Sequence, residues 1–456
     1  MSFAEALPLL MFFTLAILLF SGFPVAFVLA GIALFFGGIG MMLDVFSGIE
    51  FYNIVLRMWG GAASNLLLVA IPMFVFMGIM LERSGVAEDL LHTMQVLLGR
   101  LRGGLAMAVT LMGTILAATT GIIGASVVMM GVLALPPMLN RGYQKELAVG
   151  TICASATLGI LIPPSIMLVI MGDLLSVSVG DLFLGAVFPG LLLSGLYIVY
   201  IAAVGLARPN LAPLMAKEDR SMPASVLLKM VFKTFLPPLF LILMVLGSIF
   251  IGWATPTEAS GVGAFGAILL AWYNRRLTRE CWVDVTQRSA RITSMVFVII
   301  LGATAFSYVF RSLGGEEIIE NTLLNLPFGA WGVLMVLMGT IFFLGFFFDW
   351  IEITLIVLPV FGPVVQKLDF GGLFMSPSDQ VLWFSMLVAI NLQTSFLTPP
   401  FGFALFYLKG VAPPEIEIMH LYKGIIPFVI LQLIGLGIVV SYPELVLWLP
   451  KAAFAP

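Results

Sequence analysis

Charged side chains are scarce in this sequence, and their scarcity excludes a soluble fold. Only 10% of the 456 residues are Asp, Glu, Lys or Arg, whereas 61% are hydrophobic, and the mean hydropathy is +1.14. A chain of this composition cannot cover its surface with water-compatible side chains. The net charge of −3 is also too small to indicate nucleic acid as a partner. The sequence therefore predicts a protein embedded in a lipid bilayer.

Cysteine and histidine are rare as well, with two of each. Cys153 lies in an apolar run and Cys281 in a basic loop, so we expect neither a disulfide framework nor a cysteine metal site. The chain also lacks a His-Glu-x-x-His stretch, an Asp-rich metal motif and a Ser/His pairing, which disfavours a membrane-embedded enzyme. Its apolar runs are continuous rather than alternating, which disfavours a β-barrel. The predicted fold class is an all-α polytopic membrane protein.

The basic residues define a topology. With the first apolar stretch retained as a span and the N-terminus outside, ten crossings leave 17 of the 21 Lys and Arg residues on the cytoplasmic side. Both termini then face outward, with residues 1–65 as N-terminal scaffold spans, 208–291 as cytoplasmic loops and linking spans, and 448–456 as a tail. The expected spans lie near 6–20, 23–42, 66–82, 146–171, 182–206, 234–252, 257–273, 292–310, 380–408 and 421–447.

Two further apolar regions, 104–139 and 328–366, each begin and end on one side of the membrane. The first is flanked by cytoplasmic basic residues and the second opens to the outside. The arms of the first, 104–120 and 125–139, are each at or below the length that a helix needs to cross the hydrocarbon layer. We therefore predict two re-entrant helical hairpins that enter from opposite faces.

An internal repeat accompanies the hairpins. The pentapeptide Leu-Met-Gly-Thr-Ile occurs at 111–115 and at 337–341, and Pro-Pro pairs follow at 163–164 and 399–400, where the offset in numbering is 399 − 163 = 236. The order span, hairpin, proline-broken span, span thus occurs twice, in residues 66–207 and 292–447. Because the two copies enter from opposite faces, we predict an inverted-topology repeat with a binding site where the broken spans 146–171 and 380–408 meet.

The breaks and hairpin tips carry the oxygen atoms expected at such a site. Two successive prolines unwind a helix and free backbone carbonyls, which membranes tolerate only beside protein or a water-filled cavity. Neutral oxygens suit Na⁺, and the positive N-terminal ends of half-helices suit a carboxylate or sulfonate. A Pro-Pro pair can also be a simple kink, Asp349 can be a helix cap, and hydroxyls can satisfy backbone carbonyls. The donors singled out are Thr119, Thr120 and Ser126 at the first tip, Ser155 and Thr157 before the first break, Asp349 and Glu352 at the second tip, and Asn391, Gln393, Thr394 and Thr398 before the second break.

Five segments in this order resemble one family, the large membrane subunit of the tripartite ATP-independent periplasmic (TRAP) transporters. They are Ser126 in a Gly/Thr/Ser tip, Gly159-Ile-Leu-Ile-Pro-Pro-Ser165, Thr255-Pro-Thr-Glu-Ala259, Asp349 at the second tip and Leu397-Thr-Pro-Pro400. The resemblance implies a bacterial inner-membrane importer that works with a small four-helix membrane subunit and a periplasmic substrate-binding protein. It also implies an elevator mechanism and Na⁺ coupling, with a small organic anion such as a carboxylate, 2-oxo acid or sulfonate as cargo.

The resemblance also suggests roles for individual residues, although both tips depart from the family pattern. The first tip reads Gly121-Ile-Ile-Gly-Ala-Ser126 instead of carrying adjacent serines, and the second reads Asp349-Trp-Ile-Glu352 instead of Asp-Pro-Thr. The Na⁺ ligands we expect, at two or more sites, are Thr119, Ser126, Gly159, Pro163, Asp349, Asn391, Thr398 and Pro399. The substrate-binding residues we expect are Thr120, Ser126, Thr157, Glu352, Gln393 and Thr394.

Three alternatives remain open at this point. A divalent-anion/Na⁺ symporter of similar hairpin design would need no binding protein, and a small four-helix partner distinguishes the two. A channel would need a continuous pore, which voltage-driven flux would reveal. A membrane-embedded enzyme would need a catalytic motif that the sequence lacks.

Overall fold

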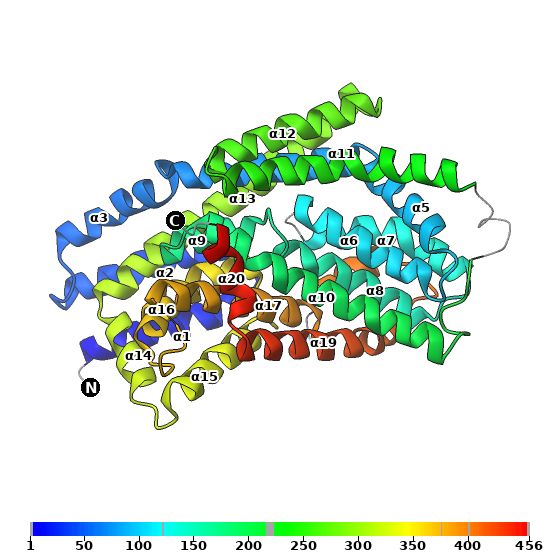
Figure 1. Ribbon diagram of the computed structural model, residues 1–456. Coiled ribbons are helices and arrows are strands. Elements are labelled where there is room, and N and C mark those ends of the chain that lie inside the picture. The colour runs from blue at the N-terminus through cyan, green and yellow to red at the C-terminus, as the bar shows by residue number, and fades with distance from the viewer. Residues whose placement is uncertain (1–2, 121–122, 216–222, 375, 400–401, 454–456) are drawn as a thin grey trace.

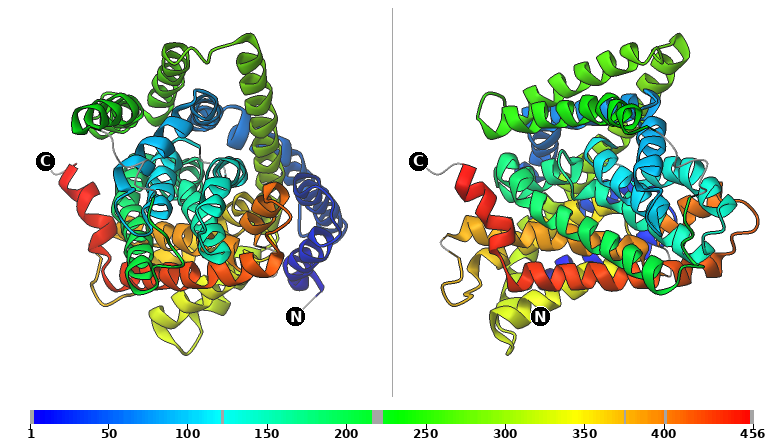
Figure 2. Two further views of the ribbon diagram at one scale, coloured as in Figure 1. Left: turned by 90° about the vertical axis from the view of Figure 1, so that its right-hand side faces the viewer. Right: turned by 45° about the vertical axis from the view of Figure 1, so that its right-hand side comes forward.

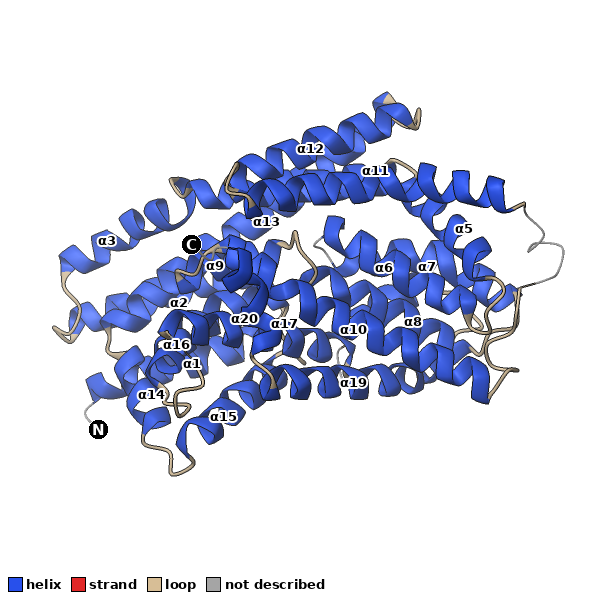
Figure 3. Ribbon diagram, in the orientation of Figure 1, coloured by secondary structure: helices blue, strands red, loops and turns tan. Residues whose placement is uncertain are grey.

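The computed structural model describes residues 3–120, 123–215, 223–374, 376–399 and 402–453, and all regular structure in these ranges is helical (Figures 1 and 3). Nine helices in these ranges are long and apolar enough to cross a membrane. Backbone amides in hydrocarbon must bond within their own segment, and helices meet that requirement. The structure therefore confirms the predicted all-α polytopic fold class.

One group of helices lies at the periphery of the molecule, with α11 and α12 on one side and α1 and α2 on another (Figure 2). Helix α4 packs against α12 and α13, and α13 packs against α2. We call this group the scaffold. Its members are α1 (Phe3–Leu19), α2 (Val25–Met42), α3 (Gly48–Met58), a π-helical turn (Trp59–Ala63), a 3₁₀ turn (Leu66–Val69), α4 (Ala70–Arg83), α11 (Ala224–Phe250), α12 (Pro256–Tyr273) and α13 (Arg279–Ser312).

The first hairpin and first broken helix follow α4 in the chain. Helix α5 starts after Gly85, whose φ of +80° is accessible to glycine without strain. The hairpin arms α6 and α7 then pack against α8, the first half of the broken helix. The elements are α5 (Val86–Leu98), α6 (Gly104–Thr120), α7 (Ile123–Asn140), α8 (Lys145–Thr157), a 3₁₀ turn (Leu158–Ile160), α9 (Ile166–Leu175) and α10 (Val179–Ala207).

The same order of elements recurs after α13. A short helix again starts after a left-handed glycine, Gly314 with φ +84°, and leads into a hairpin, a broken helix and a long helix. The elements are α14 (Gly315–Leu324), α15 (Gly329–Leu344), α16 (Trp350–Lys367), α17 (Pro377–Leu397), α18 (Phe403–Val411), α19 (Ile418–Ser441) and α20 (Glu444–Ala453).

The two sets interlock at the centre of the molecule. Arm α7 packs against α18 of the other set, and arm α16 packs against α9 in the same way. The two hairpins lie toward opposite ends of the molecule, with their closed ends pointing toward its middle (Figure 1). That they enter the membrane from opposite faces, and that the sets form an inverted repeat, stay predictions.

Four elements differ from the sequence-based expectations. The second arm of the first hairpin, expected over 125–139 and too short to cross, runs from Ile123 to Asn140 as α7 and is one of the described helices long enough to cross a membrane. Residues 48–58 form an amphipathic helix, α3, where the sequence analysis named only scaffold spans. The span expected at 421–447 ends at Ser441, because Tyr442 leaves helical geometry before Pro443 and α20 starts anew. Helix α11 begins at Ala224, well before the expected start of that span at 234.

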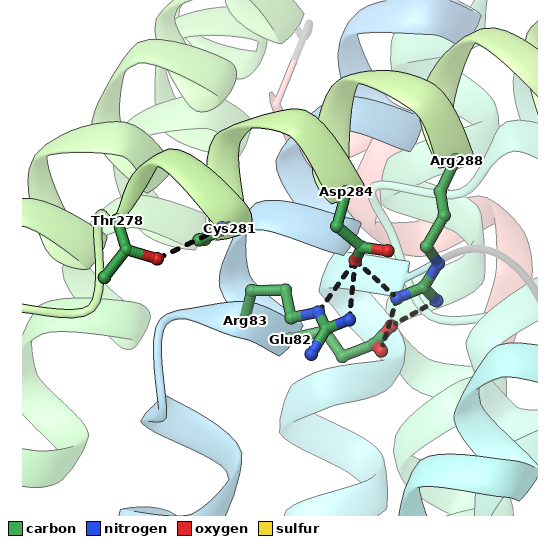
Figure 4. Close-up of polar contacts among 6 residues, drawn as sticks. All are labelled: Glu82, Arg83, Thr278, Cys281, Asp284 and Arg288. Atoms are coloured by element: carbon green, nitrogen blue, oxygen red, sulfur yellow. Dashed lines mark hydrogen bonds and ion pairs between the residues drawn. The ribbon is translucent and has the colours of Figure 1, made fainter.

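A network of charged residues joins α4 to α13 (Figure 4). Arg288 makes two hydrogen bonds to the Glu82 carboxylate, at 2.8 and 3.0 Å, and Arg83 donates to Asp284 at 2.8 Å. A two-bond arginine–carboxylate pair holds a fixed geometry, unlike a single exposed ion pair. These four side chains therefore fix the relative position of two scaffold helices at their predicted cytoplasmic ends.

Candidate functional site

The first helix break is buried at the centre of the molecule. Helix α8 ends at Thr157, a 3₁₀ turn follows, and an irregular stretch through Pro163 leads to α9. Thr157 is 0% exposed and its hydroxyl donates to the Ala154 carbonyl at 2.9 Å, which leaves the oxygen free to accept. The Ser165 hydroxyl donates to the Ile160 carbonyl at 2.6 Å and so satisfies one of the carbonyls freed by the break. The break predicted from the double proline is thus present, with Gly159 and Pro163 buried in it.

The second break follows α17. The Thr398 hydroxyl donates to the Thr394 carbonyl at 2.7 Å, and α18 begins at Phe403. Thr398 and Pro399 are partly exposed, whereas Asn391, Gln393 and Thr394 are buried. Of the Pro-Pro pair at 399–400, the second proline lies outside the described residues.

Each break is anchored near the repeated pentapeptide. The two Pro-Pro pairs are 236 residues apart, and with that offset Ser155 of the first set corresponds to Asn391 of the second. A Cβ on Gly113 would lie 2.8 Å from the Ser155 Cβ, so α6 and α8 touch there. In the second set, the Asn391 amide donates to the Met338 carbonyl at 2.7 Å. In each set, therefore, the first hairpin arm is anchored to the same point of its broken helix.

The first tip is only partly described. Helix α6 ends at Thr120, and the side chains of Thr119 and Thr120 lie outside the described residues, so their predicted roles stay predictions. Ser126 is 4% exposed near the start of α7. The start of α7 meets the other set, because a Cβ on Gly124 would lie 3.0 Å from the ring of Tyr407 on α18.

The second tip is organised by a pair of carboxylates. Asp349 caps α16 and accepts from the Trp350 amide at 2.9 Å, while Glu352 accepts from the Asp349 amide at 3.2 Å. The capping role left open from the sequence is therefore real, and the two side chains form a capping box at the start of α16.

Gln393 is one of two fully buried glutamines, with Gln432, whose amide atoms have no hydrogen-bond partner among the described residues. With the 236-residue offset between the two Pro-Pro pairs, Gln393 corresponds to Thr157 of the first set. Helix α17 packs against both α8 and the 3₁₀ turn of the first break, Leu158–Ile160. An unpaired buried amide costs free energy unless something binds it. The structure thus marks this predicted substrate-binding residue as one with free bonding capacity.

The donor set fits an alkali cation better than a transition metal. The described residues contain no group of three His, Cys, Asp or Glu side chains able to hold a metal. They do offer neutral hydroxyl, amide and carbonyl oxygens at two breaks and one tip carboxylate, the hard ligands that Na⁺ takes in broken-helix transporters. The structure brings Asp349 and Glu352 together and gathers Asn391, Gln393 and Thr394 on α17, but within the described ranges it shows no hydrogen bond between these two groups.

Sequence reasoning missed two contacts at this site. Tyr407, whose ring meets the start of α7 at Gly124, carried no signal beyond being an aromatic residue after a break. Gly345 packs so tightly on Ser395 that a Cβ would lie 2.2 Å from the serine Cβ. A glycine just before a predicted tip could have suggested such an approach, but its partner lies on a different helix and far along the sequence.

A cavity of about 440 Å³ is lined by scaffold helices α3 and α13 on one side and by α9 and α16 on the other. Its lining includes Arg57, Arg311 and Asp173. Next to it, the Asn65 amide donates to the Asp173 carboxylate at 2.6 Å, which links the turn before α4 to α9. The scaffold thus touches the hairpin and broken-helix elements through few polar contacts at this end.

Broken helices that face two hairpins in the core of a helical membrane protein are the architecture of a secondary transporter. A solved structure with this fold is the YdaH transporter of Alcanivorax borkumensis, which matches with a TM-score of 0.59 at 15% identity, over 87% of this chain and 89% of that one. At that identity the likeness concerns the fold alone.

The chain belongs to the DctM component family of the tripartite ATP-independent periplasmic transporters, whose model matches residues 12–445. It is 31% identical to the C4-dicarboxylate TRAP transporter large permease protein DctM of Pseudomonas aeruginosa, over 84% of this chain and 86% of that protein. It is 28% identical to the sialic acid large permease protein SiaM of Vibrio cholerae, over 95% and 96% of the two chains. The protein is thus a multi-pass transporter subunit and not an enzyme, as the sequence predicted.

Proposed function

We propose that this subunit imports a small organic anion together with Na⁺, in a complex with a small membrane subunit and a periplasmic binding protein. The observation that carries the proposal is the pair of broken helices at the centre of the molecule, each anchored to its own hairpin and each contacting the other set. The family name, a tripartite periplasmic transporter component, supports the two partners. The named cargoes of the relatives, C4-dicarboxylates and sialic acid, support a carboxylate.

The anion is held without arginine. None occurs in residues 104–140, 145–175, 329–367 or 377–411, which contain both hairpins and both broken helices. The positive N-terminal ends of α9 and α18, the hydroxyls beside them and the Gln393 amide are the donors that remain. A bound cation then supplies the positive charge that an arginine would otherwise bring to the anion.

Na⁺ would be held by the breaks and the second tip. The residues that fit are Thr157 and the carbonyls around Gly159 and Pro163 in the first set, and Asp349 with Asn391 and Thr398 in the second. Bound there, Na⁺ would offset the negative charge of the cargo and couple its uptake to the sodium gradient. Asp349 is already positioned by its cap and Thr157 by the end of α8, so little reordering of these two residues accompanies binding.

Transport would follow an elevator movement. The hairpins and broken helices pack closely with α10, α19 and α20 as one body, which we call the transport body. The scaffold is joined internally by the Glu82–Arg288 and Arg83–Asp284 pairs. The transport body would slide against this scaffold and carry the site between the two sides of the membrane.

Reconstituted transport tests the proposal. The cargo is first identified by thermal-shift screening of the soluble binding protein against short-chain carboxylates, 2-oxo acids and sulfonates. Proteoliposomes containing both membrane subunits should then accumulate that cargo only with the binding protein outside and an inward Na⁺ gradient. Equal accumulation with K⁺ replacing Na⁺, or without the binding protein, would contradict the proposal.

A further inference from the structure

A second polar cavity lies on the transport body, away from the two breaks. It has a volume of about 530 Å³ and lies between α8, α10 and α19. Its polar lining comes from Gln144 and Glu146 at the start of α8, Tyr200 and Arg208 on and after α10, and Lys423 on α19. Neither the transport proposal nor the family resemblance uses these residues.

The walls of this cavity are fixed by backbone contacts. The Gln144 amide donates to the Leu211 carbonyl at 3.0 Å, which ties the chain after α10 to the start of α8. On the inner side α8 and α19 touch directly, because a Cβ on Gly150 would lie 2.1 Å from the Gly424 carbonyl oxygen. The Tyr200 ring is held edge-on against Phe428 at 5.3 Å. These backbone and ring contacts therefore fix the positions of the helices that form the walls of the cavity.

Two cations point to an anionic ligand. Arg208 and Lys423 are exposed, and neither makes an ion pair or a side-chain hydrogen bond among the described residues. Their neighbour Lys145, by contrast, donates to the Glu415 carbonyl at 2.9 Å. Glu146 is the one carboxylate in the described lining, so the cavity carries a formal charge of +2 − 1 = +1. An occupant with one net negative charge balances it.

The level of the cavity along the membrane normal indicates that its ligand is a lipid. Helix α10 has 29 residues, so at ~1.5 Å per residue it is about 43 Å long and exceeds the ~30 Å hydrocarbon layer. Arg208 directly follows its last residue and therefore lies at the level of the headgroups, on the side that the basic residues predict to be cytoplasmic. The lining also has an apolar part, which includes Ala203, Val204, Ala207 and Pro427.

We propose that this cavity binds the headgroup of one anionic phospholipid from the cytoplasmic leaflet. Arg208 and Lys423 contact its phosphate, Glu146 and Gln144 accept hydrogen bonds from headgroup hydroxyls, and the apolar wall takes the start of an acyl chain. Basic pockets between membrane helices on the cytoplasmic side bind lipid phosphates by this combination of charge and depth.

Native mass spectrometry of the detergent-purified subunit tests the site with three lipids of matched chain length, phosphatidylglycerol, phosphatidylcholine and phosphatidylethanolamine. Phosphatidylglycerol should be retained most strongly. The double variant Arg208→Gln/Lys423→Gln should raise its half-saturating concentration about twenty-fivefold, the product of about fivefold for each charge. The matched control Arg279→Gln/Arg291→Gln removes two exposed cations on α13, on the same predicted side, and should leave retention unchanged.

Charge-conserving variants keep the test decisive if the double variant misfolds. Arg208→Lys/Lys423→Arg should retain phosphatidylglycerol within about threefold, because each position keeps its cation. Equal retention of phosphatidylcholine or phosphatidylethanolamine, or unchanged binding in the double glutamine variant, would overturn the proposal. Displacement of the lipid by equimolar succinate would instead identify a site for free anions and overturn it as well. Neither partner nor cargo is needed, so this outcome is separate from that of the transport proposal.

Discussion

The Gln393 side chain is fully buried, and its amide group has no hydrogen-bond partner in the described part of the chain. Leaving such a group unpaired costs about 1–3 kcal/mol. Most core positions on α17 are apolar, and a leucine here would avoid that cost. The glutamine is therefore better explained as a ligand-binding group than as a packing residue.

Replacing Gln393 by leucine should separate stability from function. Because the variant removes an unsatisfied amide, the ligand-free subunit should unfold at a temperature equal to or higher than that of the unmodified protein, while uptake falls tenfold or more. Differential scanning fluorimetry and proteoliposome uptake measure the two quantities.

Gln380 on the same helix provides the control. Its amide donates to the Leu368 carbonyl at 2.9 Å and to the Val365 carbonyl, so Gln380→Leu should lower the unfolding temperature. If Gln393→Leu were destabilised as much as Gln380→Leu, the argument from its unpaired amide would be wrong.

Asp349 has two roles that one substitution can separate. Asparagine is as good an N-cap as aspartate, so Asp349→Asn should retain α16 and its thermal stability. It removes the tip's negative charge, and the Na⁺ concentration for half-maximal uptake should therefore rise about tenfold or more. Asp349→Ala should show both the Na⁺ defect and a loss of about 1 kcal/mol in stability. An unchanged Na⁺ dependence in Asp349→Asn would exclude the carboxylate as a ligand.

At the scale of elements, the transport body is held together by direct backbone contact between helices. Besides the Gly150–Gly424 approach between α8 and α19, α6 meets α8 at Gly113 and the chain just after α15 meets α17 at Gly345. Small residues allow membrane helices to approach closely enough for dispersion forces and backbone contacts to act. These contacts hold the halves of the broken helices that precede the breaks, α8 and α17.

Gly424→Ala should destabilise this crossing. A Cβ there would lie 2.3 Å from the Glu146 carbonyl oxygen, so α19 must shift, at a cost of about 1–3 kcal/mol. Gly437→Ala on the same helix meets nothing within 4 Å and should be neutral or slightly stabilising. Thermal unfolding of the two variants measures the difference, and equal midpoints would contradict the close packing.

The breaks and the hairpin regions could be predicted from the sequence because proline acts locally and flanking charges bound each apolar region, but the length of α7 could not, since the sequence does not show where its first turn starts. The capping role of Asp349, left open from the sequence, is a local feature of the same kind. Helix α3 was not predicted, since its Ser47 and Glu50 capping box adjoins a half-polar stretch that resembles a loop. The unpaired state of Gln393 and the partners of Gly113 and Tyr407 depend on packing between distant segments, which a single sequence does not contain.

At the scale of the whole molecule, the scaffold and the transport body meet through few polar contacts. One of them is the Asn65–Asp173 hydrogen bond beside the 440 Å³ cavity, between the turn before α4 and α9. An elevator movement must break it. The ion pairs that join α4 to α13 lie within the scaffold and would persist (Figure 4).

A disulfide between Asn65→Cys and Asp173→Cys, in a background with Cys153 and Cys281 replaced by alanine, should stop transport. Uptake should fall tenfold or more on oxidation and recover on reduction, because the bond fixes the two bodies together. The control pair Leu66→Cys/Thr257→Cys lies within the scaffold, where the Thr257 hydroxyl bonds to the Leu66 carbonyl at 3.1 Å, and should transport in both states. Full uptake by the oxidised 65/173 pair would contradict a sliding transport body.

The most direct test of the account asks whether this subunit binds Na⁺ at all. Binding to the folded state alone stabilises it, by about 2.7 kcal/mol when the ion is at a hundred times its dissociation constant. The thermal unfolding midpoint of the purified subunit should therefore rise by several degrees as NaCl replaces KCl at constant ionic strength. Identical midpoints in the two salts would contradict a sodium site at the broken helices.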